Sequence, residues 1–194
     1  EQYIIDCRHK LHAIPEVCSK EVKTKAFLME EIKKSGLPYE EVPTNSIIVK
    51  LDTGRPGKVV ALRADIDGLP VKESDENLTR PRACKSEHDG YCHACGHDAH
   101  MAMLLGALKV LPQLKGQLSG TVLFCFEEGE EQGTGVDALL AALEKYHVDR
   151  CWGIHVYADL AENKMSVDAG PRMAGSAVTT ATFKGKGGHG SRPD

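Results

Sequence analysis

Histidine and cysteine concentrate in one short segment of the chain. Four of the nine histidines and three of the seven cysteines lie between positions 84 and 100: Cys84, His88, Cys92, His93, Cys95, His97 and His100. Thiolate and imidazole groups are the preferred ligands of zinc-like ions. The cluster therefore predicts a metal site, and a histidine-rich surface loop is the simpler alternative.

Two features outside the cluster strengthen the metal interpretation. Glu130 and Glu131 end an acidic run that begins at Glu127, and His155 stands alone in an apolar segment. Neighbouring side chains diverge, so one glutamate can hold a metal while the other accepts a proton from water. The run taken alone would be a solvated acidic turn. Together with the cluster it indicates catalysis.

The elements that must position these residues can be read from apolar spacing and from breakers. Helices are predicted over 2–14, about 19–35, about 99–111 with Asp98 as N-cap, and 137–146. Strands are predicted over 46–51, 58–63, 121–126 and 150–156, with the last two buried. The turn residues 53–57 predict that the first two strands form a hairpin. Cys125 and Cys151 are expected to be buried in their strands.

The order of these elements predicts an α/β fold, with a mixed, mostly parallel sheet covered by helices on both faces. Cys95 and His97 precede a helix, the glutamate pair follows one strand, and His155 lies near the end of another. Sites in open α/β sheets form outside the carboxyl ends of strands. Three segments are therefore expected to meet at one edge. A Thr-rich strand over 178–184 predicts a further element, which begins near Gly175.

Composition excludes several classes of protein. The 194 residues are 41% apolar and 27% charged, which is globular, and no apolar run reaches the length of about 18 residues that a membrane span needs. The net charge is −4 and aromatic residues make up 5%, which argues against nucleic acid as a partner. Seven cysteines cannot all pair, and no signal segment is visible at the start of the sequence, so we expect a cytoplasmic protein.

Six segments in the same order carry a resemblance to a known family. They are LHAIPE at 11–16, LRADIDGLP at 62–70, HACGHDAH at 93–100, Glu130-Glu131, GIHV at 153–156 and GKGGH at 185–189. Together they resemble the M20 metallopeptidases, in the amidohydrolase branch with hippurate hydrolases, auxin-conjugate hydrolases and N-acyl-amino-acid deacylases. The resemblance spans essentially the whole chain, and the HACGHDAH segment is the most specific of the six.

The resemblance implies a zinc-exopeptidase-like catalytic domain over 1–174 and the start of an α+β lid and dimerisation domain over 175–194. It implies a homodimeric hydrolase with two divalent metal ions, which could be zinc, manganese, cobalt or nickel. Family members are much longer than this chain, so the remaining lid and the last metal-binding histidine are expected beyond Asp194. Residues 1–194 alone are therefore expected to be inactive.

The resemblance also assigns roles to residues. Cys95, His97, Glu131 and His155 are implied as metal ligands, and Glu130 is implied as the general base. His189 is implied to reach the substrate of the neighbouring subunit. The implied reaction is hydrolysis of the amide bond of an N-acyl amino acid or short peptide by a metal-activated water. The alternative is a catalytically inactive metal-binding or assembly module of the same fold.

Some assignments stay open at this stage. Glu127 and Glu128 form a rival pair, although the count from Gly120 favours the later pair. Asp65 and Asp67 could support a metal ligand or cap a loop. His9 and His12 are expected to be packing or surface residues, and His93 and His100 could support metal ligands. Cys92 and Cys95 have the spacing of half a zinc ribbon, but the sequence has no second cysteine pair to complete it.

Overall fold

The computed structural model of the chain describes residues 1–77, 80–175 and 177–192. It divides into two compact units, Glu1–Tyr157 and Ala158–Asp194. The described residues of the second unit contain no helix and no strand beyond an isolated bridge between His189 and Arg192. The strand predicted over 178–184 is therefore wrong for the described residues, because a strand needs a hydrogen-bonded partner. The domain boundary near Gly175 stays a prediction.

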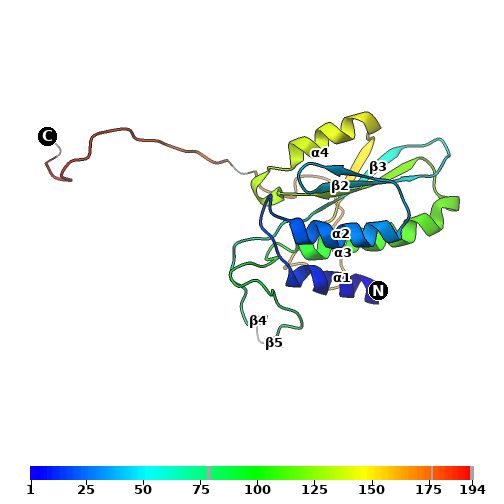
Figure 1. The fold of residues 1–194 in the computed structure, drawn as a ribbon, viewed down its shortest axis with the longest axis horizontal. Coiled ribbons are helices and arrows are strands. Elements are labelled where there is room, and N and C mark those ends of the chain that lie inside the picture. The colour runs from blue at the N-terminus through cyan, green and yellow to red at the C-terminus, as the bar shows by residue number, and fades with distance from the viewer. Residues whose placement is uncertain (78–79, 176, 193–194) are drawn as a thin grey trace. The chain divides into compact units, whose positions relative to one another are not determined.

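A five-stranded sheet forms the centre of the first unit (Figure 1). Its strands are β1 (Tyr39–Val42), β2 (Ser46–Asp52), β3 (Val59–Asp65), β6 (Thr121–Glu127) and β7 (Arg150–Gly153), in the order β1-β2-β6-β3-β7. The pairs β1–β2 and β2–β6 are antiparallel, whereas β3–β6 and β3–β7 are parallel. The sheet is therefore mixed, as predicted, and its parallel half carries the strand ends of interest.

Helices cover both faces of the sheet. The helices α1 (Gln2–Ala13), α2 (Val22–Lys34) and α3 (His97–Val110) lie on one face, and α4 (Val136–Leu143) lies on the other (Figure 1). The remaining elements are three short 3₁₀ helices and a two-stranded ladder: Leu111–Gln117, Glu130–Gln132, Glu144–Tyr146, and β4 (Glu76–Asn77) with β5 (Arg80–Pro81).

The larger core lies under the three helices. Leu11, Leu28 and Met101 from these helices pack with Phe124 and Phe126 of β6, and all five side chains are fully buried. Each contributes about 1.5–3 kcal/mol by leaving water. A smaller core on the other face joins the α4 residue Leu139 to the sheet. Because β6 is packed on both faces and paired on both edges, the residues at its carboxyl end are held firmly.

The predicted hairpin over 46–63 is wrong. Strand β6 lies between β2 and β3 and pairs with both of them. The turn residues instead contact the start of β6, where the Thr53 hydroxyl donates to the Gly120 carbonyl at 2.7 Å. A Cβ on Gly57 would lie 2.6 Å from the Gly120 nitrogen, so glycine is required for this approach. Turn chemistry is local, whereas the pairing is decided by a strand that lies about 60 residues later in the chain.

The prediction that residues 150–156 form a buried strand is also wrong. All four residues of β7 are exposed, and Trp152 keeps 51% of its surface accessible. β7 is an edge strand of the described sheet, and none of its residues belongs to either hydrophobic core of the described chain, so its faces are not covered. Cys151 is therefore exposed, whereas Cys125 on the central strand β6 is buried as predicted.

Helix α3 starts two residues earlier than predicted. Its N-cap is Gly96, which has φ +103°, and no side-chain cap is formed. Asp98 lies inside the first turn and accepts hydrogen bonds from His12 Nδ1 at 2.7 Å and Arg8 Nε at 2.9 Å. The predicted capping role of Asp98 is thus wrong, because its buried carboxylate joins α3 to α1. His12, expected as a packing or surface residue, is a buried member of this network.

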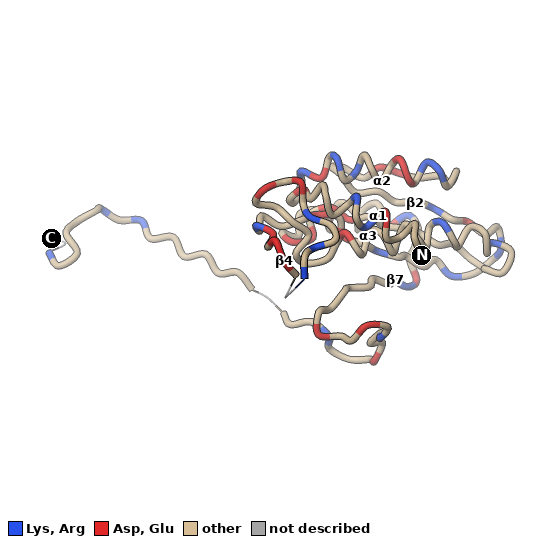
Figure 2. Tube along the Cα trace, turned by 90° about the horizontal axis from the view of Figure 1, so that it is seen from below, with Lys and Arg blue, Asp and Glu red and all other residues tan. Residues whose placement is uncertain are grey.

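The surface of the first unit carries mixed charge. Lysines and glutamates are interspersed along α2 (Figure 2), and Lys34 pairs with Glu31 at 2.7 Å. Among the residues that the structure describes, no helix combines the length and apolarity needed to cross a membrane.

Candidate metal centre

The predicted ligands converge at the carboxyl ends of the parallel strands. Cys95 precedes α3 and His97 begins it, while Glu130 and Glu131 lie in the 3₁₀ helix that follows β6. His155 comes two residues after the end of β7. All of these residues belong to the first unit. Since β3, β6 and β7 are neighbours in the sheet, three segments distant in sequence deliver polar side chains to one place.

Three overlapping sets of side-chain atoms lie close enough together to share an ion. They are Cys95, His97 and His155; His97, Glu130 and Glu131; and Asp65, His97 and His100, with the ligand atoms of each set within 4.8 Å of one another. His97 belongs to all three sets. Its Nε2 lies 3.7 Å from both Glu130 Oε2 and Glu131 Oε1. The Cys95 sulfur lies 3.3 Å from His155 Nε2.

Unpartnered buried atoms show that these residues fit a metal. His97 Nε2 and Glu131 Oε1 are buried without a hydrogen-bond partner among the described residues. A buried polar atom without a hydrogen-bond partner costs about 1–3 kcal/mol of stability, so these two atoms destabilise the fold in the absence of an ion. Both atoms offer lone pairs, and a divalent ion accepts lone pairs from imidazole, carboxylate and thiolate. An ion beside His97 would satisfy both atoms.

Asp67 holds two segments of the candidate centre together. His97 Nδ1 donates to the Asp67 carbonyl at 2.9 Å and lies 3.2 Å from Asp67 Oδ1. The backbone N–H of Glu131 donates to Asp67 Oδ2 at 3.0 Å. These contacts place the proton of His97 on Nδ1 and leave Nε2 as a lone pair that faces the glutamates. Asp67 therefore sets the orientation of the imidazole and the position of the glutamate turn.

Asp65, two residues earlier, has a similar orienting role. Its Oδ1 lies 2.6 Å from His100 Nδ1, and its Oδ2 accepts from Arg63 at 2.8 Å. Burial opposes the charged carboxylate, yet the His100 hydrogen bond and the neighbouring positive charges lower the pKa of Asp65 to about 2. The roles of Asp65, Asp67 and His100 were open from the sequence. Two aspartates at a strand end and a histidine one helical turn after His97 were the patterns that could have indicated them.

Burial shifts other groups toward their neutral forms. Burial and then the neighbouring Glu131 raise the pKa of the Cys95 thiol to about 12, and burial also raises the pKa of Glu130. Since only the thiolate binds metal, an ion at Cys95 must displace its proton. His93 is buried with both ring nitrogens unpartnered among the described residues, and burial lowers its pKa to about 4. His93 belongs to none of the three sets.

The rival pair, Glu127 and Glu128, is hydrogen-bonded to groups outside the candidate centre. Glu127 accepts two hydrogen bonds of 2.9 Å from Arg63. Glu128 accepts from the backbone N–H groups of Thr44 at 2.6 Å and Asn45 at 3.0 Å. Neither glutamate belongs to a set of possible ligands among the described residues. Cys92 is likewise buried outside these sets, so no ribbon-like group forms around it in the described chain.

His189, the remaining predicted site residue, lies in the second unit. Its Nδ1 lies 3.0 Å from the Ser191 hydroxyl. Its predicted contact with a neighbouring subunit's substrate stays a prediction.

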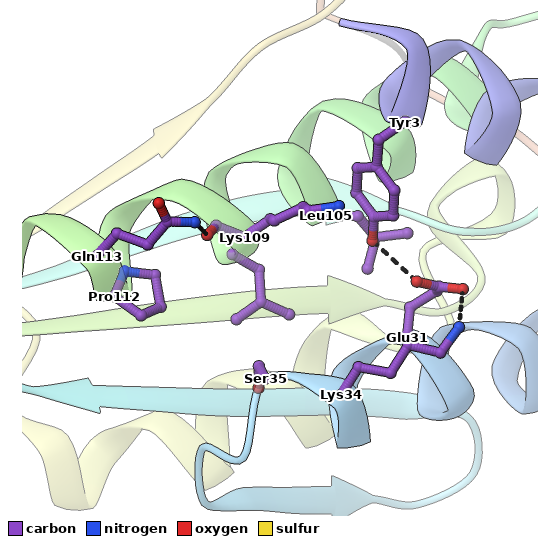
Figure 3. Close-up of a pocket in the computed structure, with 9 residues that line it drawn as sticks. Tyr3, Glu31, Lys34, Ser35, Leu105, Lys109, Pro112 and Gln113 are labelled. Carbon is purple, nitrogen blue, oxygen red and sulfur yellow. Dashed lines mark hydrogen bonds and ion pairs between the residues drawn. The ribbon is translucent and has the colours of Figure 1, made fainter.

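A pocket at the opposite end of α3 has a different character (Figure 3). It encloses about 330 Å³ between α1, α2 and α3. Glu31 accepts from the Tyr3 hydroxyl at 3.0 Å and from Lys34 at 2.7 Å, and the Lys109 ammonium lies 3.9 Å from the centre of the Tyr3 ring. These polar groups satisfy one another. The pocket therefore offers volume without the unpartnered lone pairs found around His97.

Comparison with known proteins agrees with this geometry. Residues 61–189 match the model of peptidase family M20/M25/M40. The chain is 38% identical over 198 residues to thermostable carboxypeptidase 2 of Saccharolobus solfataricus, covering 100% of this chain and 49% of that protein. It is 38% identical over 192 residues to the N-acyl-L-amino acid amidohydrolase of Geobacillus stearothermophilus, covering 98% of this chain and 50% of that protein.

The fold has a counterpart among solved structures. The Bacillus subtilis YXEP protein, described as a dinuclear metal-binding peptidase from the M20 family, superposes with a TM-score of 0.75 at 33% identity. The match covers 82% of this chain and 44% of that one. The chain thus spans about half the length of the curated relatives that it matches. The chain belongs to peptidase family M20/M25/M40.

Proposed function

We propose that the protein hydrolyses the amide bond of N-acyl amino acids or short peptides at a metal centre built around His97. The observation that carries the proposal is the pair of buried, unpartnered atoms, His97 Nε2 and Glu131 Oε1, which face each other at 3.7 Å within the described chain. The relative from Geobacillus stearothermophilus is named for N-acyl amino acid hydrolysis, which supports the substrate class.

Four residues would hold the metal: Cys95, His97, Glu131 and His155. Two divalent ions are proposed, in line with the description of the Bacillus subtilis structure as dinuclear. Their identity is proposed to lie among zinc, manganese, cobalt and nickel. When bound, such ions polarise a carbonyl and lower the pKa of water. His97, shared by all three sets of possible ligands, is proposed to stand at the middle of the centre.

Glu130 is proposed as the general base. Its Oε2 lies 3.7 Å from His97 Nε2, and its side chain is 39% exposed, compared with 22% for Glu131. The more exposed carboxylate can meet a substrate and the attacking water, while Glu131 holds the ion. Glu130 takes a proton from the water and passes it to the leaving amine. Burial raises the pKa of Glu130, which brings a carboxylate nearer to the range of an effective base.

The assembly is proposed from the family resemblance. Residues 175–194 would begin a lid domain that forms a homodimer, and His189 would contact the substrate of the partner subunit. A cytoplasmic location is proposed on the free cysteines.

The test is metal-dependent turnover by the full-length protein, with any sequence that follows Asp194, because residues 1–194 alone are expected to be inactive. After treatment with a chelator, the protein is assayed on hippurate and N-acetyl amino acids with and without added manganese or zinc. We expect hydrolysis only with metal. Stoichiometric metal binding without turnover of either substrate class would favour the inactive metal-binding module.

A further inference from the structure

Both ring nitrogens of His100 are engaged. The backbone N–H of Val156 donates to His100 Nε2 at 2.9 Å, so this nitrogen must carry the lone pair. The proton is therefore on Nδ1, which lies 2.6 Å from Asp65 Oδ1 and donates to it. His100 is 3% exposed and Asp65 is 1% exposed, so water cannot replace either bond. Although His100 lies near His97, its ring has no lone pair left for an ion in this arrangement.

The residue that His100 holds adjoins a proposed ligand. Val156 follows His155, and the Val156 carbonyl lies 2.6 Å from His155 Nδ1. That contact directs the other nitrogen of His155, Nε2, toward the Cys95 sulfur at 3.3 Å. The backbone of Val156 is thus held through its N–H by His100, and through its carbonyl it orients the imidazole of His155.

Few other contacts fix this segment. It follows β7, an edge strand whose four residues are all exposed, and Ile154 and Val156 are themselves 42% and 38% exposed. The side chain of Val156 lies against Gly96, where an added Cβ would come within 2.3 Å of Val156 Cγ2. The buried bond to His100 is therefore the main polar link between the His155 segment and the rest of the centre within the described residues.

We propose that His100 is a positioning residue that ties Asp65 to the backbone of Val156 and so holds His155 opposite Cys95. The inference rests on the proposed metal centre and adds a residue that does not bind the ion. The two ring nitrogens of His100 have different roles. One nitrogen anchors the ring to a buried carboxylate, and the other fixes an exposed segment. Loss of the bond between Val156 N–H and His100 Nε2 alone should let His155 move away from Cys95.

Two substitutions separate these bonds. His100→Asn places a donor near the position of Nδ1, so it keeps the Asp65 bond and loses the Val156 bond. His100→Gln places an acceptor near the position of Nε2, so it keeps the Val156 bond. His9→Asn, on α1 outside the centre, is the matched control, and thermal melting verifies that each variant folds.

The first readout needs no metal. Amide hydrogen exchange at Val156 is measured in the metal-free full-length protein. We expect protection in wild type, His9→Asn and His100→Gln, and fast exchange in His100→Asn. The second readout is cobalt(II) affinity, followed by the absorption of the bound ion. His100→Asn is expected to bind cobalt about 10- to 100-fold more weakly, the usual scale for losing a group that orients a ligand, whereas His100→Gln retains the wild-type affinity.

The outcomes separate this inference from the proposed function. Wild type that binds no cobalt would overturn the metal centre and the inference together. Wild type that binds cobalt, with Asn and Gln variants equal to each other in affinity, would overturn the inference alone. If His100→Asn does not fold, Val156→Pro removes the same N–H from the other side and is expected to give the same loss of cobalt affinity; wild-type affinity in that variant would also overturn the inference.

Discussion

Two pairs of adjacent glutamates, separated only by Gly129, are used in opposite ways. Every carboxylate oxygen of Glu127 and Glu128 accepts a hydrogen bond from Arg63 or from a backbone N–H. In the later pair, Glu131 keeps a buried oxygen without a partner among the described residues. Residue type and spacing are the same in both pairs. What distinguishes the candidate site is a buried lone pair that the fold does not use.

The backbone explains this difference. Glu127 is the last residue of β6 and pairs in register with Asp65 on β3, so its side chain stays beside Arg63. Gly129 then adopts φ +63°, and a Cβ at this position would lie 2.2 Å from the Thr134 hydroxyl. Only glycine permits this turn without strain. The chain therefore leaves the sheet after Glu127 and brings Glu130 and Glu131 to the N-terminal end of α3, beside His97.

The largest expected effect separates the two pairs by turnover. Glu130→Gln should keep its metal and lose activity by a factor on the order of 10² or more, because the general base is removed. Glu127→Gln, the matched control, should retain most of the activity of the molecules that fold. Steady-state kinetics with metal analysis of the same samples provides the measurement. A metal-retaining, inactive Glu127→Gln would show that the pairs are assigned the wrong way round.

The next effect concerns metal retention. Cys95→Ala and Glu131→Ala each remove a proposed ligand, so affinity should fall by more than the about 10- to 100-fold that follows loss of an outer hydrogen-bond partner. Cys92→Ala, three residues before Cys95 and outside the ligand sets of the described chain, should leave metal content unchanged. Elemental analysis after dialysis measures the bound ion. Unchanged metal in Cys95→Ala would remove this thiolate from the centre.

How far the sequence predicts this molecule depends on how local each feature is. The helices at 2–14 and 99–111 and the strand at 121–126 were predicted within a few residues, because period and breakers lie inside each segment. The hairpin prediction failed because β6 inserts between its two strands. The capping role of Asp98 failed because its partner His12 lies 86 residues away.

For the candidate centre too, the sequence predicted the features that depend on local pattern and missed those that depend on distant contacts. Residue types and strand ends predicted that Cys95, His97, Glu130, Glu131 and His155 would meet, and the structure brings them together. The count from Gly120 favours the later glutamate pair, but the sequence could not show that Glu127 and Glu128 are already hydrogen-bonded, since their partners Arg63 and Thr44 are distant in the chain. It also could not show that both nitrogens of His100 are occupied.

A smaller effect should appear in stability rather than in chemistry. Glu128→Gln replaces a buried carboxylate that accepts two backbone N–H groups, and the amide oxygen serves them less well. We expect a loss of about 1–3 kcal/mol of unfolding free energy, with metal content unchanged. Chemical denaturation measures the loss. If Glu128→Gln kept full stability but lost metal, the early pair would belong to the centre after all.

The smallest effect tests a glutamate far from the centre. Burial opposes the charge of Glu31, but hydrogen bonds from Lys34 and Tyr3 outweigh it and lower its pKa (Figure 3). A lowered pKa in the folded state stabilises above the unfolded value of about 4.3 and is lost as pH falls through the folded value. Glu31→Gln should therefore cost about 0.5–1 kcal/mol at pH 7 and less below about pH 4. Glu30→Gln, with a largely exposed side chain, is the control in the same denaturation series.

The most direct measurement of the central claim is anomalous diffraction from crystals of the full-length protein grown with manganese or zinc. The account predicts an anomalous peak within bonding distance of His97 Nε2 and Glu131 Oε1, two buried atoms that have no hydrogen-bond partner among the described residues. Cys95 and His155 should approach the same centre. A peak at Glu127 or Glu128, or no peak beside His97 in crystals that contain the ion elsewhere, would contradict the account.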